Sequence, residues 1–224
     1  MHVYDTINTT TYHFKIKKGI SMDQEQIFFE KIKALNNFHM PRWKDLPEID
    51  LYMDQVISVT DKYLGAFFSS GDPVLTPSMI NNYVKNEVIP PPCKKKYSRE
   101  HLAKLIVICI LKPVMEISAI SYIMKRSEKL YGVQKMLDSF SEGFEKRIFS
   151  LVPEIESAFD ENVNNEEVLC SIATENAIKA GTEKIMANYA YMAFYKEPPA
   201  EKSDKKKEKA KDKSAPPQEV KSEK

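Results

Sequence analysis

The chain is poor in glycine and cysteine for its length, and each shortage excludes a class of protein. Only six glycines occur in 224 residues, and none lies in a glycine-rich loop of the kind that binds nucleotide phosphates. The three cysteines, Cys93, Cys109 and Cys170, are an odd number and lie far apart. This spacing argues against a disulfide framework and for a reducing compartment. We therefore expect a cytoplasmic protein without a nucleotide-binding fingerprint.

Long apolar runs are also missing. The longest candidate, Leu105 to Leu111, has seven residues, whereas a membrane-spanning helix needs about eighteen or more. The first residues lack the charged-then-apolar pattern of a secretory signal, so no membrane partner is expected. No nucleophile elbow, paired-carboxylate spacing or metal-ligand pair occurs. We expect no catalytic residue, metal or cofactor, and the only enzyme left open is one whose catalytic groups are scattered along the chain.

Charge is balanced overall but unevenly distributed. The formal net charge is +1, yet residues 196–224 carry ten lysines against seven acidic residues and leave the preceding part slightly acidic. This tail has no aromatic residue and one valine, too little apolar surface to offset the entropy of ordering it. Within the body, residues 85–104 hold six basic residues against two acidic ones. The sequence therefore predicts a disordered tail and one local basic site.

Hydrophobic periodicity predicts an all-α protein of six to seven helices with at most a small β-ribbon. Helical spacing of apolar residues covers 23–38, 51–68, 77–85, 99–112, 117–124, 133–152 and a final stretch that ends near residue 195. Thr76 and Pro77 have the residue types of an N-cap and a first helical position. Asp50 is expected to cap the helix at 51–68, and His101 is expected at the surface.

The order of the parts between residues 50 and 124 is the most informative feature. A long helix, a tight turn and a short polar helix precede a proline-stiffened basic segment, an apolar helix and one more short helix. This is the arrangement of a helix-turn-helix with a wing. Asn81 and Asn82 of the short helix have the donor and acceptor that match adenine in the major groove. Lys94, Lys95 and Lys96 would meet phosphates from the wing.

Several landmarks in this region resemble the N-terminal domain of MerR-type winged-helix regulators. They are Thr76, the Ile80-x-x-Tyr83 pair, the Val88-Ile89-Pro90 step, Tyr97 ahead of a helix with Leu102 and Leu105, and Ile117-x-x-Ile120. The chain departs from that pattern at Asn81 and Asn82, where such regulators usually present an arginine. The resemblance implies a DNA-binding winged helix in which Lys85 is the one phosphate-binding residue of the short helix.

A closer resemblance covers about residues 38–150. The segments FHMPRWKDLPEIDLYMDQVI, TPSMINNYVK and KKKYSREHLAKLIVICILK look like an uncharacterised domain family of Gram-positive bacteria. That family implies a fold and supplies no established activity. We divide the chain into an N-terminal extension with a short helix (1–37), a MerR-like winged helix-turn-helix domain (38–130), a C-terminal helical region (131–195) and the tail (196–224).

The sequence thus predicts a sequence-specific DNA-binding transcriptional regulator whose partner is double-stranded DNA. The recognition helix is expected at 77–85 and the basic wing at 90–97. The expected DNA-contacting residues are Thr76, Ser78, Asn81, Asn82, Lys85, Lys94, Lys95, Lys96, Tyr97 and Arg99. For Tyr97 a second interpretation is a packing residue at the base of the wing.

A second copy of the chain is the other expected partner, since regulators of this type pair two winged helices on DNA. The C-terminal helix carries part of a coiled-coil seam, which consists of Ile178, Thr182, Ile185, Tyr189 and Met192. The alternative function is a non-catalytic protein–protein interaction module built on a winged-helix scaffold.

Overall fold

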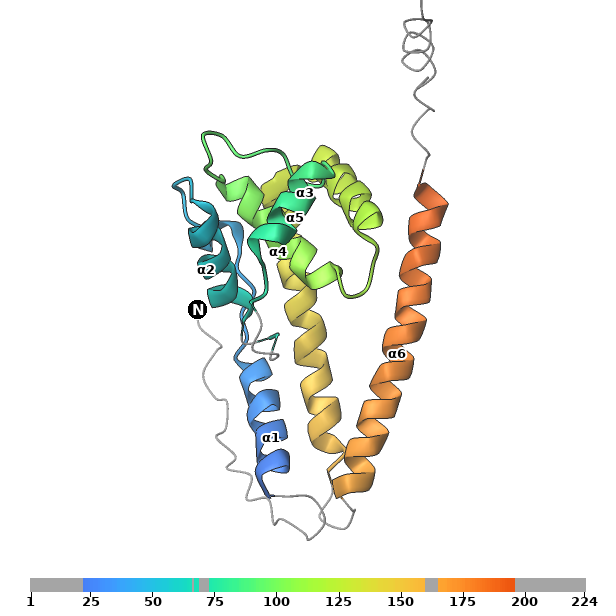
Figure 1. Cartoon of the computed structure of the whole chain (residues 1–224). Helices are drawn as coiled ribbons and strands as arrows, with labels where there is room; N and C mark the ends of the chain where they lie inside the picture. Colours follow the sequence, from blue (N-terminus) through green and yellow to red (C-terminus); the bar gives the residue numbers. More distant parts are fainter. Residues whose placement is uncertain (1–21, 66, 69–72, 160–164, 196–224) are drawn as a thin grey trace, which may run out of the picture.

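The computed structural model describes residues 22–65, 67–68, 73–159 and 165–195. This part of the chain is helical and contains no β-strand beyond isolated bridges (Figure 1). The elements are α1 (Met22–Asn36), the 3-10 turn η1 (Trp43–Asp45), α2 (Met53–Leu64), α3 (Pro77–Lys85), α4 (Arg99–Leu111), α5 (Ile117–Ser157) and α6 (Asn165–Phe194). The all-α prediction is confirmed. The expected extension up to residue 21 and the expected disordered tail lie outside the described residues. None of the described helices is long and apolar enough to cross a membrane.

Helix α4 forms the centre of the core because its sequence is apolar on nearly every side. Every residue from His101 to Ile110 is buried, and α4 packs against both α2 and α5. Side chains from α2 and α3, among them Val56, Ile80 and Tyr83, belong to the same hydrophobic cluster. The short polar helix is therefore held to the core by its apolar side.

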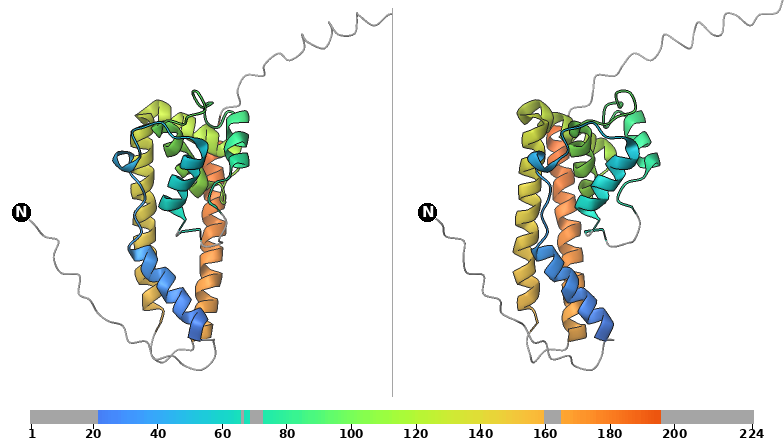
Figure 2. Two further views of the ribbon diagram at one scale, coloured as in Figure 1. Left: turned by 60° about the vertical axis from the view of Figure 1, so that its left-hand side comes forward. Right: turned by 90° about the vertical axis from the view of Figure 1, so that its left-hand side faces the viewer.

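Helix α5 consists of two helical segments that meet at a kink. Gly132 has φ 79° and ψ 161°, a conformation open to glycine and strained for other residues. The sequence predicts two helices here, and the kink lies between them. The second segment continues through Pro153 to Ser157, beyond its expected end. Figure 2 shows the bend, which lies next to the expected domain boundary at 130/131.

Polar side chains of α5 fix the segment that leads into α2. The Asp138 carboxylate accepts a hydrogen bond from the Trp43 backbone N–H (2.7 Å). The Ser141 hydroxyl donates to the Pro41 carbonyl (2.9 Å), and Glu145 forms an ion pair with Arg42 (2.6 Å). Because these three α5 residues are about one helical turn apart, they present one continuous polar edge. The Trp43 turn is thereby fastened to α5.

The second half of α5 is flanked by α1 and α6 (Figures 1 and 2). The Phe28 and Phe29 rings of α1 lie 5.9 and 5.0 Å from the Phe159 ring. Helix α6 runs back along α5 and is joined to it by two ion pairs, Lys179–Glu154 (3.3 Å) and Arg147–Glu183 (2.5 Å). Val168 is the one described residue of α6 that is buried, so most of the helix is open to solvent.

Two local predictions around α2 are wrong. Tyr52 is the N-cap and the Gln55 side chain accepts from its N–H (2.9 Å), so Asp50 does not cap this helix. The helix ends at Leu64 and not at residue 68. The Phe67 ring instead packs 5.7 Å from Phe38 and 5.2 Å from the ring of residue 144 on α5. Packing against distant aromatics thus outweighs the local helical spacing, and the expected tight turn at 69–73 lies almost wholly outside the described residues.

Candidate nucleic-acid interface

Helix α3 begins as its sequence predicts. The Thr76 hydroxyl accepts a hydrogen bond from the Met79 backbone N–H (3.2 Å), and Pro77 occupies the first helical position. This confirms the expected cap, and it leaves Thr76 half-buried with its hydroxyl engaged. The buried side of α3 carries Ile80 and Tyr83. Four of the predicted DNA contacts are exposed on the helix: Ser78, Asn81, Asn82 and Lys85.

Helix α3 ends in a Schellman motif that contains no glycine. The Val88 N–H donates to the Tyr83 carbonyl (2.9 Å), and the Glu87 N–H donates to the Val84 carbonyl (3.1 Å). Glu87 has φ 54°, the left-handed conformation that this motif usually assigns to glycine. Val88 and Tyr83 are both buried, and this apolar pair accompanies the turn. The motif leaves the exposed Glu87 carboxylate next to the basic segment.

A two-residue hairpin forms the tip of the predicted wing. Cys93 and Lys96 exchange both backbone hydrogen bonds, at 3.0 and 2.8 Å. Lys94 and Lys95 between them have φ 49° and 64°, which is the pattern of a type I′ turn. Both lysines and Cys93 are exposed. Type I′ turns favour Asn-Gly, so a Lys-Lys pair is an unusual occupant.

The base of the hairpin is anchored in the core. Tyr97 and Leu51 exchange backbone hydrogen bonds of 2.8 and 2.9 Å, so the hairpin is joined to the segment in front of α2. The Tyr97 side chain is 3% exposed, its ring lies edge-on to His101, and burial raises its pKa. Of the two interpretations of Tyr97, the structure favours the packing one because the phenol does not reach the surface.

Two of the predicted cations lie over aromatic rings of their own chain. The Arg99 guanidinium donates to the Leu46 carbonyl (2.7 Å), pairs with Glu48 (3.4 Å) and lies over the Trp43 ring. Lys96 is half-buried, with its ammonium 5.2 Å from the centre of the Tyr52 ring. Arg99 therefore fixes the turn at 43–48 to the start of α4, and its Nε and Nη2 donors are engaged by that turn.

The exposed charge of this surface is smaller than the sequence count of residues 85–104. Lys104 is buried and paired with Glu128 (2.8 Å). Within the described part of the chain, the ion pairs include neither Lys85 nor the two lysines at the hairpin tip. No large hydrophobic side chain is exposed between residues 77 and 97. This surface is polar and locally basic.

His101 is buried and has a structural role. The prediction that it lies at the surface is wrong. Its side chain is buried, and its Nδ1 accepts a hydrogen bond from the Ser98 backbone N–H (3.0 Å). Nε2 lies 3.2 Å from the Pro90 carbonyl and can donate to it in the matching tautomer. Burial is the main cause that lowers the pKa of His101, which favours the neutral ring. His101 occupies the place of Glu or Gln in a capping box after Ser98, and this spacing could have revealed it.

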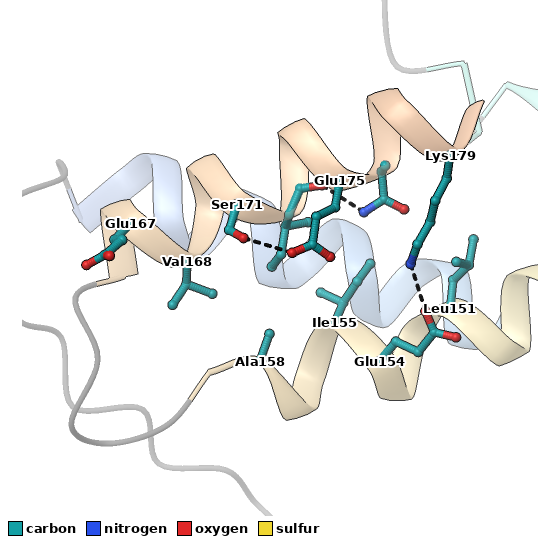
Figure 3. Close-up of a pocket in the computed structure, with 11 residues that line it drawn as sticks. Leu151, Glu154, Ile155, Ala158, Glu167, Val168, Ser171, Glu175 and Lys179 are labelled. Carbon is teal, nitrogen blue, oxygen red and sulfur yellow. Dashed lines mark hydrogen bonds and ion pairs between the residues drawn. The ribbon is translucent and has the colours of Figure 1, made fainter. Parts of the chain in front are cut away.

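A groove between the end of α5 and the start of α6 lies elsewhere in the molecule (Figure 3). Its volume is about 300 Å³, and two pairs of its polar side chains bond to one another. Lys179 pairs with Glu154, and the Ser171 hydroxyl donates to Glu175 (3.0 Å). No group of three metal-ligating side chains occurs among the residues that the structure describes. We therefore assign no site to this groove.

Residues 41–142 match the model of a family described as a domain of unknown function (DUF1836). The matched part runs from the η1 turn through α2, α3, the hairpin and α4 into the second segment of α5. The expected resemblance to an uncharacterised family is confirmed over this range. No curated protein and no solved structure matches the chain.

Proposed function

We propose that the chain is a sequence-specific DNA-binding transcriptional regulator. In this proposal α3 enters the major groove and the hairpin at 93–96 contacts the phosphate backbone. Both elements lie at the end of the molecule remote from α1 (Figure 1). The proposal is supported by a surface that joins amide and hydroxyl side chains on a short helix to lysines without ion pairs, and that exposes no large apolar side chain.

The observation that carries the proposal is the strained tip of the hairpin. Lys94 and Lys95 both hold left-handed backbone angles, which cost a side-chain-bearing residue about 1 kcal/mol or more each. Asn-Gly would form the same turn with less strain. The two lysines lower the stability of the fold through this strain. Phosphate binding by their exposed ammonium groups would explain why lysines occupy the turn. Backbone contacts of this kind supply affinity and position without reading sequence.

Asn81 is the residue proposed to recognise the DNA base sequence. The Asn82 side-chain oxygen accepts from the Asn86 amide (2.8 Å), and the same amide donates to the Asn82 carbonyl (2.9 Å). Asn81 is exposed and takes part in none of the side-chain hydrogen bonds within the described residues. Its amide is thus available for bidentate pairing with adenine N6 and N7. Ser78 and Lys85 flank it on the same short helix and would contact the backbone or neighbouring bases.

The α2–α3 pair differs from a compact helix-turn-helix. That motif joins its helices by about three or four residues, whereas α2 ends at Leu64 and α3 starts at Pro77. Asp61 bridges part of this connection, because its carboxylate accepts from the Val74 N–H (2.9 Å). The proposal therefore rests on α3 and the hairpin and does not need a tight turn.

A second copy of the chain completes the proposed regulator. Helix α6 is joined to α5 by two ion pairs and exposes several large apolar side chains along its length. Side chains at 3- and 4-residue spacing are exposed by half or more: Ile178 (61%), Ile185 (50%), Tyr189 (62%) and Met192 (67%). These residues and Thr182 form the partial coiled-coil seam of the sequence. A seam that repeats on one helix can pair with itself about a two-fold axis.

The same α6 seam favours the alternative function, a protein-interaction module on this scaffold, if another protein covers it. The two functions differ at α3 and the hairpin, where an interaction module would need apolar surface and the described residues expose none. DNA binding is therefore the better supported function.

Selection from random double-stranded DNA at a stated low salt concentration tests the proposal. We expect one motif to be enriched, and Asn81→Ala to cost about 1–3 kcal/mol on that motif and almost nothing on random DNA. Asn36→Ala, on the exposed surface of α1, is the matched control and should bind like the parent. The absence of an enriched motif, or an Asn81→Ala variant that keeps full discrimination, would overturn the proposal.

A further inference from the structure

A second cavity lies where the kinked α5 folds around α4. Its volume is about 510 Å³, within the range of about 300–1,000 Å³ that is usual for small-molecule sites. Both segments of α5 contribute to it, one on each side of Gly132, and α4 contributes Val107 and Leu111. The cavity is therefore enclosed by the two segments of α5 and the second half of α4. We call it the elbow groove.

The elbow groove has an apolar floor and a polar rim. Val107, Met124 and Met136 line it and are themselves buried, so they form the floor. Half-buried apolar side chains, Leu111, Ile123 and Phe140, stand beside them. Two methionines in the floor suit an irregular flexible ligand, because the unbranched thioether adapts its shape.

One cation stands at the rim. Lys135 is the single charged residue among those that line the elbow groove, and no carboxylate lines it. Lys135 is exposed, and no ion pair of the described residues includes it. Its ammonium lies 5.4 Å from the centre of the Tyr131 ring, also at the rim. That contact with an aromatic ring favours an ammonium placed at the mouth of the groove.

We propose that the elbow groove binds a small amphipathic carboxylate, such as a medium-chain fatty acid. The apolar chain would lie on the methionine floor, and the carboxylate would meet the Lys135 ammonium in a charge-assisted hydrogen bond. The hydroxyls of Ser127 and Ser139, which also line the groove, are further donors for the carboxylate. This inference is independent of the proposed DNA binding, since none of its residues belongs to α3 or to the hairpin.

Calorimetric titration of the full chain tests the site with three probes of equal chain length, each below its micelle concentration. The probes are decanoate, decanol and decyltrimethylammonium. We expect one molecule of decanoate per chain and about tenfold weaker binding of decanol, the factor that one charge-assisted contact supplies. The cationic probe should bind least because it would lie against Lys135.

Variants separate this site from general apolar binding. Lys135→Met keeps the length of the side chain and removes its charge, so decanoate should bind about as weakly as decanol. Ile123→Trp fills the groove and should abolish binding of both, with circular dichroism reporting that the helices remain. Lys129→Met changes an exposed α5 lysine that does not line the groove and should behave like the parent.

Three results would overturn the inference. They are equal affinity of the parent for decanoate and decanol, a Lys135→Met variant that keeps the preference for decanoate, and no binding of decanoate at all. Binding of decanoate only as it dissociates a dimer would assign the groove to a second copy of the chain and would also overturn it.

Discussion

Three residues with side chains, Glu87, Lys94 and Lys95, have left-handed backbone angles, and all three lie between the end of α3 and the start of α4. Glycine or asparagine would adopt these angles at lower cost. At the scale of single residues, the surface proposed for DNA is therefore also where the described backbone carries most strain. Strain that persists in a folded protein is often retained for function.

Replacing Lys94-Lys95 by Asn-Gly should move stability and DNA binding in opposite directions. We expect the free energy of unfolding to rise by about 1–2 kcal/mol, because Asn-Gly relieves the strain of the type I′ turn. DNA affinity should fall because two phosphate contacts are lost. Urea unfolding and DNA titration measure the two quantities on one preparation. A variant that is less stable than the parent, or that binds DNA equally well, would contradict the account.

Glu87→Gly should stabilise the protein and strengthen DNA binding together. The left-handed position at the end of α3 accepts glycine without strain, so we expect a gain of about 1 kcal/mol in unfolding free energy. Removal of a carboxylate from a basic surface should also strengthen attraction to phosphates. Glu87→Gln is the control, since it removes the charge and retains the strain. It should therefore strengthen DNA binding without the gain in stability.

At the scale of elements, the sequence predicts which segments are helical. It does not predict which distant residues the side chains next to these helices contact. The cap of α3 at Thr76 and the burial of α4 follow from local chemistry, and both are confirmed. The inward position of Arg99 depends on carbonyls more than fifty residues earlier in the chain, which no local pattern reveals. The sequence predicts a basic wing at 90–97 but not its type I′ turn, because Lys-Lys is disfavoured in that turn.

The hydrogen bonds of buried His101 to Ser98 and Pro90 predict a pH dependence of stability. Burial lowers the pKa of His101 below the value of 6.5 that it has when unfolded, so the unfolded chain binds the proton first as pH falls. The contribution of the neutral ring is therefore complete above about pH 6.5 and is lost as pH falls toward the lower folded pKa. His101→Gln keeps a capping-box acceptor without this titration. In urea unfolding at a series of pH values, the parent should lose more stability than His101→Gln below pH 6.5, and parallel profiles would contradict this.

The outward seam of α6 predicts a dimer that one charge can disrupt. Ile185→Glu or Tyr189→Glu would bury a carboxylate in an apolar interface, so we expect a monomer with unchanged helix content. Lys184→Glu places the same side chain on the neighbouring surface of α6, away from the seam, and should remain a dimer. Sedimentation equilibrium measures the mass directly. A parent that is monomeric at tens of micromolar would exclude this interface.

At the scale of the whole molecule, α3 and the hairpin lie at one end and the α1, α5 and α6 helices extend away from it (Figures 1 and 2). We propose a different role for each part. In the proposals above, the end with α3 and the hairpin would bind DNA, the α6 seam would pair two copies, and the elbow groove between α4 and the two segments of α5 would bind a small carboxylate. Each role rests on different residues, so each can fail without the others.

The salt dependence of DNA binding tests the central claim most directly. A double variant, Lys94→Ala/Lys95→Ala, should flatten the slope of log K against log salt by about 2 for each bound protomer, since each lost phosphate contact removes about 0.9. Lys31→Ala/Lys33→Ala removes two exposed lysines from α1, at the other end of the molecule, and should leave the slope unchanged. We expect this difference although the two variants have the same net charge. Equal slopes for both variants, or a parent that binds no DNA at low salt, would contradict it.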